Sequence, residues 1–191
     1  MNPVKIFGFA GSTYVRTARA SCVEKGIPHE LVPLEFQAES HRARHPFMRM
    51  PALEHEGHAF FETLAIGTYL DSLAEAPALH PASAAQRATM MQWISVAIDY
   101  LYRDLVRALL ADAVAEGAAE TAARDLDILD RGLAGSAYLA GDSISLADLF
   151  VAPMLAFAES KDPRFGPGER SELKRWLAHM TSRESFRATA G

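Results

Sequence analysis

Residues 4–13 read Val4-Lys5-Ile6-Phe7-Gly8-Phe9-Ala10-Gly11-Ser12-Thr13, an apolar run followed by a turn. The run suits a short buried strand, and Ser12 and Thr13 are residue types that favour the N-cap of a helix. Apolar residues then recur at helical spacing as far as Gly26, and glycine commonly ends a helix in the left-handed conformation. We therefore expect the chain to open with a strand, a turn and a helix over about Tyr14 to Lys25.

Three further strands are expected before residue 62. Residues 30–34 suit a second strand, and Pro33 confines it to a sheet edge because proline has no N–H to donate to a neighbouring strand. Residues 52–55 and 58–61 are predicted to form a hairpin about the turn Glu56-Gly57. The first part of the chain is therefore predicted to contain a four-stranded sheet.

A polar loop, a helix and a linker complete this first part. Residues 35–49 are polar and irregular, so no regular structure is expected there. Four apolar residues between positions 66 and 73 share one helical face, which predicts a helix that begins near Glu62 or Thr63. The proline-containing residues 75–82 suit a linker over the surface.

The chain beyond residue 82 has the pattern of helices throughout. Helices are expected over residues 84–110, 118–133, 146–157 and 171–180. Ser145 and Asp148 have the spacing of a capping box, and Pro153 in the following helix costs one hydrogen bond. We therefore predict a first domain over residues 1–74, a linker over residues 75–82 and an all-helical domain over residues 83–191.

The composition argues against several classes of function. The 191 residues are 49% hydrophobic and 23% charged, and the longest apolar runs are too short to span a membrane. The formal charge of -5, with basic residues dispersed among acidic ones, argues against nucleic-acid binding. Small molecules or proteins are the expected partners. Because no export signal is visible, a cytoplasmic location is expected.

The cysteine and histidine residues do not predict metal or redox chemistry. The single cysteine, Cys22, excludes an intramolecular disulfide and a Cys-x-x-Cys pair. It falls on the apolar face of the first helix, so we interpret it as a core residue and not as a nucleophile. Four histidines lie in the polar loop or beside the hairpin turn, and no pair has metal-ligand spacing on one helix. They are His41, His45, His55 and His58.

Four segments, in order along the chain, carry a family resemblance. They are Lys5-Ile6-Phe7-Gly8 with Gly11-Ser12-Thr13 and Arg16, then His45–Leu53, then Phe61–Ile66 with Tyr69-Leu70, and last Leu139–Asp148. Together they resemble the cytosolic glutathione transferases, and the first segment resembles the serine-type, phi-like classes. The resemblance implies an α/β plus all-α fold. A thioredoxin-like domain with a four-stranded mixed sheet would precede an all-helical C-terminal domain.

The resemblance also implies that glutathione is the co-substrate and that Ser12 is the catalytic residue. A free thiol has a pKa of about 8.5, so the site must favour the thiolate at neutral pH. The Ser12 hydroxyl can donate to the sulfur at the start of the first helix, where N–H groups also favour negative charge. The alternative is that Ser12 only caps the helix and that Thr13 or Tyr14 is the donor.

Five further residues are implied to bind glutathione: Arg49, Met50, Pro51, Glu62 and Thr63. A cis peptide before Pro51 would let the Met50 backbone pair with the cysteinyl part of glutathione. Thr63 and N–H groups at the helix start would bind the γ-glutamyl carboxylate, and Glu62 would bind the ammonium. The alternatives are a trans proline that opens a strand, ordinary helix-start residues, and an arginine on the surface.

The implied reaction is addition of the thiolate to a small electrophilic, largely apolar substrate. Phe9 and the first helices of the C-terminal domain would hold that substrate, and no metal is needed. Such a transferase of alkyl or aryl groups would serve detoxification, and family members form homodimers. The alternative function is a noncatalytic module of the same fold that binds ligands or proteins. Met48 and Arg49 keep this alternative open, because the family usually has Gly and then Gln or Lys at these positions.

Overall fold

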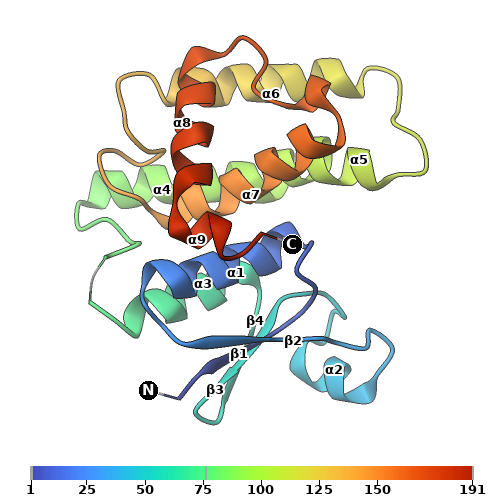
Figure 1. Cartoon of the computed structure of the whole chain (residues 1–191), viewed down its shortest axis with the longest axis vertical. Coiled ribbons are helices and arrows are strands. Elements are labelled where there is room, and N and C mark those ends of the chain that lie inside the picture. Colours follow the sequence, from blue (N-terminus) through green and yellow to red (C-terminus); the bar gives the residue numbers. More distant parts are fainter. Residues whose placement is uncertain (1, 76, 191) are drawn as a thin grey trace. The chain divides into compact units, whose positions relative to one another are not determined.

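The structure is a computed structural model that describes residues 2–75 and 77–190. The chain forms two compact units, Met1–Ala78 with Glu184–Gly191, and Leu79–Arg183 (Figure 1). The sequence had placed all of residues 83–191 in the helical domain. The structure instead groups the C-terminal segment with the first unit, because helix α9 (Glu184–Arg187) packs on helix α1 (Thr13–Glu24).

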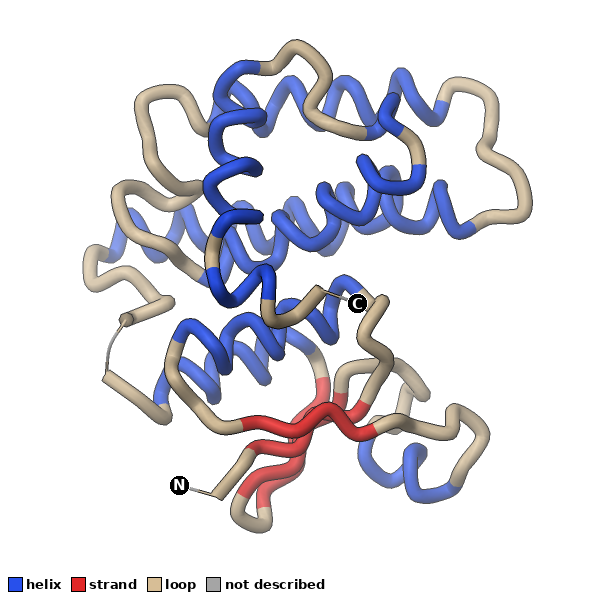
Figure 2. The backbone as a smooth tube through the Cα atoms, viewed as in Figure 1, coloured by secondary structure: helices blue, strands red, loops and turns tan. Residues whose placement is uncertain are grey.

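The first unit is built on a mixed sheet of four strands, shown in red in Figure 2. These strands are β1 (Val4–Phe7), β2 (His29–Val32), β3 (Ala52–His55) and β4 (His58–Phe61). Their order is β2-β1-β3-β4, with β1 and β2 parallel and the other pairs antiparallel. The predicted sheet and hairpin are confirmed. Strand β2 lies at the edge and ends just before Pro33, as a proline requires.

Each face of this sheet is covered by different elements. Alternate side chains of a strand point to opposite faces, so Ile6 packs with α1 and α3 (Thr63–Ser72) while Phe7 packs on the other side. Helix α2 (Glu39–Arg44) lies on the Phe7 side, where the Arg44 guanidinium carbon is 4.2 Å from the centre of the Phe7 ring. The expectation of irregular structure over residues 35–49 was therefore wrong for α2.

Two close approaches fix α1 on the first unit. A Cβ atom on Gly8 would lie 2.4 Å from Val15 Cγ2, so only glycine lets α1 pack this close to the end of β1. At the other end of α1, the buried Lys25 ammonium donates to Asp71 Oδ1 at 2.8 Å and to the carbonyl of Pro77 at 2.7 Å. These contacts fix the position of α1, the helix whose N-cap is Ser12.

The second unit is helical, as predicted. Its elements are α4 (Ala84–Val96), η1 (Ala97–Arg107), α5 (Ala108–Leu110), α6 (Ala118–Gly132), α7 (Leu146–Lys161), η2 (Pro163–Phe165) and α8 (Ser171–Ser182). The expected helix over residues 84–110 is continuous, but its middle part η1 is a π-helix. Helix α7 runs four residues beyond the expected end at Phe157, and Pro153 does not stop it.

The core of the second unit is organised around the start of α7. The predicted capping box is present, because Asp148 accepts from the N–H and hydroxyl of Ser145, both at 2.9 Å. Asp148 also accepts from Leu139 N–H and from Trp176 Nε1, again at 2.9 Å. Burial raises the pKa of this carboxyl, while the four hydrogen bonds act in the opposite direction. One buried carboxyl group thus joins a loop, α7 and α8.

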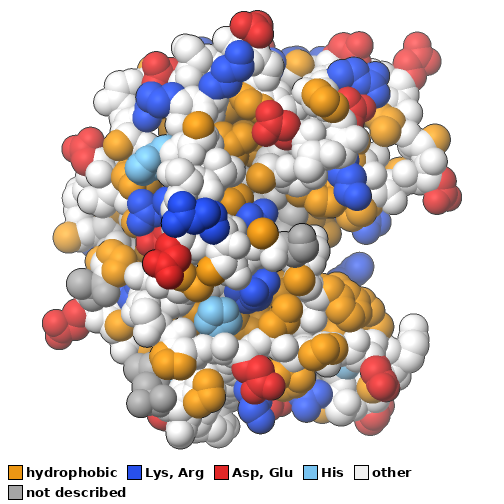
Figure 3. Space-filling model, viewed as in Figure 1, with side chains coloured by type: hydrophobic (Ala, Val, Ile, Leu, Met, Phe, Trp, Pro, Cys, Tyr) orange, Lys and Arg blue, Asp and Glu red, His pale blue; other side chains and the backbone are white. Residues whose placement is uncertain are grey.

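The surface carries charges of both signs. On the face shown in Figure 3, Lys and Arg side chains are interspersed with Asp and Glu side chains. This arrangement agrees with the dispersed charges of the sequence. Among the described residues, no helix is both long enough and apolar enough to cross a membrane.

Candidate functional site

Three segments that are far apart in the sequence meet at one edge of the sheet in the first unit. Phe7 at the end of β1 pairs with Ala52 at the start of β3, and Ala52 pairs with Phe61 at the end of β4. The residues just after β1, just before β3 and just after β4 therefore lie side by side. This register brings together the loop that contains Ser12, the Met50-Pro51 peptide and the Glu62-Thr63 helix start.

Ser12 is the N-cap of α1 and lies in the first of these segments. Its backbone is extended, its N–H donates to the Phe9 carbonyl at 3.1 Å, and its Oγ accepts from Val15 N–H at 3.4 Å. The capping interpretation of Ser12 is thus confirmed. It does not exclude a catalytic one, since capping uses an oxygen lone pair and leaves the hydroxyl proton to be donated elsewhere.

The second segment carries a cis peptide between Met50 and Pro51, as predicted. Pro51 is buried, Met50 is half-buried, and Arg49 is exposed. Met48 has a φ of 53°, in the left-handed region that favours glycine. The family pattern usually has glycine at this position, so the backbone conformation is kept although the residue has changed.

The third segment is the start of α3. Glu62 has a φ of 67° and is exposed, whereas Thr63 is only 7% exposed. No side chain caps this helix, and the Glu62 carbonyl accepts from Ile66 N–H at 3.0 Å. The N–H groups of the first turn thus lie next to the exposed carboxylate of Glu62 and the hydroxyl of Thr63. Together these groups suit a ligand that carries both a negative and a positive charge.

Aromatic rings and two histidines surround these segments. Phe9 is 43% exposed, and its ring centre lies 5.5 Å from that of Phe36. Residues 35–49 were expected to form a polar loop, and His41 and His45 lie in this segment. The side chains of both histidines are buried, so that expectation was wrong for them. Both nitrogens of His41 and Nδ1 of His45 have no hydrogen-bond partner.

The charge state of His45 follows from this burial. Burial lowers the pKa of His45, and the nearby carboxylate of Glu62 partly opposes that effect. The lowered pKa favours the neutral form of His45. Sequence patterns missed both buried histidines because α2 carries no apolar stripe of its own.

Known proteins match the chain in both halves. The family described as "Glutathione S-transferase, N-terminal domain" matches residues 6–78, and "Glutathione S-transferase, C-terminal domain" matches residues 95–184. Glutathione S-transferase 3 of Zea mays is 32% identical over 99% of this chain and 94% of that protein. The chain belongs to the glutathione S-transferase family.

Solved structures of the family agree with this assignment. Poplar glutathione transferase F1 is 27% identical and superposes with a TM-score of 0.88 over 99% of this chain and 97% of that chain. The apo form of glutathione S-transferase III is 31% identical, with a TM-score of 0.85 over 98% of this chain and 95% of that chain. The thioredoxin-like and all-helical fold is confirmed. The relatives are named as transferases, and nothing favours the noncatalytic alternative.

Cys22 is a core residue of the first unit. Its side chain is fully buried in the core between the sheet and α1. Burial raises the pKa of the thiol to about 12, so no thiolate forms near neutral pH. The interpretation of Cys22 as a core residue is confirmed. Among the described residues, no group of three or more His, Cys, Asp or Glu side chains is arranged to hold a metal ion.

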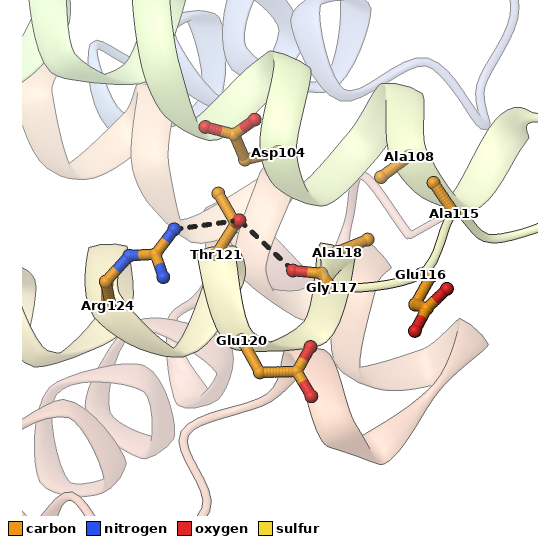
Figure 4. A pocket seen from close by; sticks show the side chains of 9 residues that line it. All are labelled: Asp104, Ala108, Ala115, Glu116, Gly117, Ala118, Glu120, Thr121 and Arg124. Atoms are coloured by element: carbon orange, nitrogen blue, oxygen red, sulfur yellow. Dashed lines mark hydrogen bonds between the residues drawn. The ribbon is translucent and has the colours of Figure 1, made fainter.

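A separate pocket lies within the helical unit of the glutathione transferase fold (Figure 4). It has a volume of about 540 Å³ and is lined by Asp104, Ala108, Ala115, Glu116, Gly117, Ala118, Glu120, Thr121 and Arg124. The lining includes the acidic residues Asp104, Glu116 and Glu120. It also includes Arg124, which donates to the Thr121 hydroxyl at 3.0 Å (Figure 4). Phe9, to which the resemblance assigned the contact with the second substrate, does not line this pocket, so the pocket is separate from the predicted substrate site.

Proposed function

We propose that the protein activates the thiol of glutathione for attack on a small electrophilic, largely apolar substrate. The observation that carries the proposal is the convergence of Ser12, Met50-Pro51 and Glu62-Thr63 at one edge of the sheet. These are the positions to which the sequence resemblance assigned the thiol, the cysteinyl unit and the γ-glutamyl end of glutathione. Family membership supports the same reaction class.

Ser12 is proposed to stabilise the thiolate. The hydroxyl proton is free of the capping contact and can be donated to the sulfur, while the positive end of the α1 dipole favours the same negative charge. A hydrogen bond to a charged acceptor contributes about 1.5–3 kcal/mol, which corresponds to about one to two pKa units. That shift brings the thiol into the range where thiolate is abundant at neutral pH.

The peptide part of glutathione is proposed to bind across the other two segments. The backbone of Met50 would pair with the cysteinyl unit, and Thr63 with the first N–H groups of α3 would bind the γ-glutamyl carboxylate. Glu62 would bind the ammonium, and its exposed position supports this role. The exposed guanidinium of Arg49 is proposed to contact a glutathione carboxylate.

The second substrate is proposed to contact Phe9. This ring is two-fifths exposed, packs edge-on against Phe36 and lies in the same loop as Ser12. It therefore offers an apolar surface close to the reacting sulfur, as an apolar electrophile needs. Phe9 is proposed to favour aromatic or alkyl electrophiles, in keeping with a cytoplasmic role in detoxification.

We also propose that the protein is a homodimer, as is typical of its family. Phe47 is 70% exposed and its ring centre lies 6.3 Å from that of Phe61, which is 37% exposed. An exposed aromatic pair of this kind is more common in an interface than on a free surface. A second copy of the chain is the proposed occupant of this surface.

Calorimetry with glutathione and a conjugation assay with a generic electrophile test the proposed activity. Binding at millimolar glutathione or below and a measurable conjugation rate are expected. Glu62→Gln should weaken binding at least about tenfold, because a charged hydrogen bond is lost. Glu56→Gln is the matched control, since Glu56 is also exposed with a positive φ but lies at the hairpin turn. No binding by the wild-type protein would contradict the proposal.

A further inference from the structure

The last residues of the chain form a clasp over α1 in the first unit. We use the name C-terminal clasp for Glu184–Ala190, which includes helix α9. Ser185, Phe186 and Thr189 of this segment are almost completely buried, with exposed fractions of 1%, 2% and 0%. The clasp packs on α1, so the clasp and α1 stabilise each other.

Arg16 makes the most specific contacts with the clasp. Its Nη2 atom donates to the Phe186 carbonyl at 2.8 Å, and its guanidinium carbon lies 3.9 Å from the centre of the Phe186 ring. One residue of the clasp is thus bound twice, through a hydrogen bond and through a cation–π contact. Arg16 is half-buried, and burial, with a further contribution from Arg19, lowers the pKa of its guanidinium.

Two other contacts extend the clasp along α1. Arg19 donates to the carbonyls of Thr189 and Ala188 at 3.4 and 3.3 Å, just beyond the C-terminal end of α9. Near the end of α1, the Ser185 hydroxyl donates to Glu24 Oε1. The contacts therefore span two turns of α1 and resist both its sliding and its rotation.

The clasp is connected to the candidate catalytic residue through a single turn of helix. The N–H of Arg16 donates to the Ser12 carbonyl at 2.9 Å, so these two residues begin and end the first turn of α1. The side chain of Arg16 binds the clasp while its backbone holds Ser12. Any displacement of this turn moves the Ser12 hydroxyl relative to the segments before β3 and after β4.

We propose that the C-terminal clasp is a positioning element for Ser12, with Arg16 and Phe186 as its positioning residues. The inference rests on the proposed role of Ser12 in thiolate formation. A hydrogen bond to the sulfur depends steeply on distance and direction, so a shift of well under 1 Å at Ser12 weakens it. The proposed contacts to the rest of glutathione come from the segment before β3 and from the start of α3, and not from the turn of α1 that Arg16 closes.

Arg16→Lys and Phe186→Leu in the full-length chain test this inference. Lysine keeps the charge of Arg16 but not the planar group over the ring, and leucine keeps an apolar residue at position 186 but removes the ring. Two measurements are made on each variant: hydrogen exchange of the α1 amides, and the pKa of bound glutathione from thiolate absorbance. Tyr69→Phe is the control, because it removes a 2.7 Å hydrogen bond to His55 elsewhere in the same unit.

The clasp proposal predicts faster exchange in α1 and a bound-thiol pKa raised by about half a unit to one unit in both variants. It also predicts kcat at neutral pH lowered about three- to tenfold, with KM for glutathione changed less than about twofold. The control should change none of these values. If the α1 amides exchange faster in the variants but the pKa of the bound thiol is unchanged, the clasp is only structural and the inference is wrong.

Failure of the proposed function gives a different result. If the wild-type protein forms no glutathione thiolate, Ser12 does not stabilise a thiolate. The inference that the clasp positions Ser12 for this role is then also wrong. In that case hydrogen exchange still reports whether the clasp protects α1. If exchange in α1 is the same in the wild-type protein and in both variants, the clasp itself is disproved whatever the thiol does.

Discussion

At the scale of single residues, the site is defined by small groups whose surroundings are tightly packed. Gly8 is the clearest case, because a Cβ atom there would lie 2.4 Å from Val15 and force α1 away from β1. Ser12 follows four residues later and depends on that approach. Met48 and Glu62 adopt positive φ values at the same edge of the sheet. The local backbone is therefore as important to the candidate site as its side chains.

Gly8→Ala tests this packing. The added methyl group should destabilise the protein by about 1–3 kcal/mol, because Val15 is fully buried and has little room to move. Gly11→Ala is the matched control in the same loop, since a Cβ atom at position 11 would meet nothing within 4 Å. Urea unfolding measures the free energy of unfolding of both variants. Equal stabilities of the two variants would show that α1 does not need the close approach.

Asp125 predicts a pH dependence of stability. Burial, together with the neighbouring carboxylate of Asp104, raises the pKa of Asp125 to about 6. Because the folded pKa lies above the usual value, the folded state binds the proton more tightly, and stability falls as pH rises from about 4 to 6. Asp125→Asn should thus be more stable than the wild type at pH 7–8.

The gain in Asp125→Asn should be less than about 1 kcal/mol, because solvent screens a partly exposed pair. The difference should vanish near pH 4, where the wild-type carboxyl is protonated. Thermal melting at pH 4 and pH 7.5 measures it. A variant that is equally stable or less stable at pH 7.5 would contradict the assignment.

At the scale of elements, buried polar contacts decide where helices start and end. Asp148 is the strongest example, since it accepts four hydrogen bonds from Leu139, Ser145 and Trp176 at the start of α7. These donors belong to a loop, a helix cap and α8. The carboxyl group is therefore the point at which the parts of the helical unit are joined.

Asp148→Ala should destabilise the protein by about 3 kcal/mol or more, because four buried donors lose their acceptor. Asp142→Ala is the control, since Asp142 lies nearby and is exposed. Chemical unfolding followed by the fluorescence of the tryptophans measures the loss. A cost below about 1 kcal/mol for Asp148→Ala would mean that water replaces the lost acceptor.

The comparison of sequence and structure is also clearest for elements. Strands β3 and β4 and helices α6 and α8 were predicted within two residues at each end, because their apolar periodicity and turn residues are strong. Helices α2 and α9 were missed, since each is short and polar and is stabilised by tertiary contacts. The π-helical winding of η1 was missed because apolar spacing does not separate it from an α-helix.

The candidate site also contains some residues that the sequence located and others that it did not. Sequence motifs located Ser12, Pro51 and Glu62, and the structure brings their segments together through the strand register. Sequence could not locate the buried His41, because its burial depends on the rings around it. It could not predict the clasp either, since Arg16 and Phe186 are 170 residues apart in the chain.

At the scale of the whole molecule, the proposed homodimer rests on Phe47. Phe47→Ser should shift the equilibrium from dimer to monomer at tens of micromolar protein, a concentration chosen on affinity grounds. Ile128→Ser is the control, because Ile128 is also an exposed apolar side chain, at 48%, but lies on α6. Light scattering gives the mass. A monomeric wild-type protein would disprove the dimer, and a dimeric Phe47→Ser would disprove the role of Phe47.

The central claim is that Ser12 stabilises the glutathione thiolate, and the pKa of the bound thiol tests it most directly. Thiolate absorbance of the glutathione complex is followed against pH for the wild type and for Ser12→Ala. Thermal melting of both proteins is also recorded, because the loss of an N-cap lowers the stability by about 1 kcal/mol. We predict a wild-type pKa well below the free value of about 8.5 and a rise of about one to two units in Ser12→Ala. A folded Ser12→Ala whose pKa equals that of the wild type would contradict the claim.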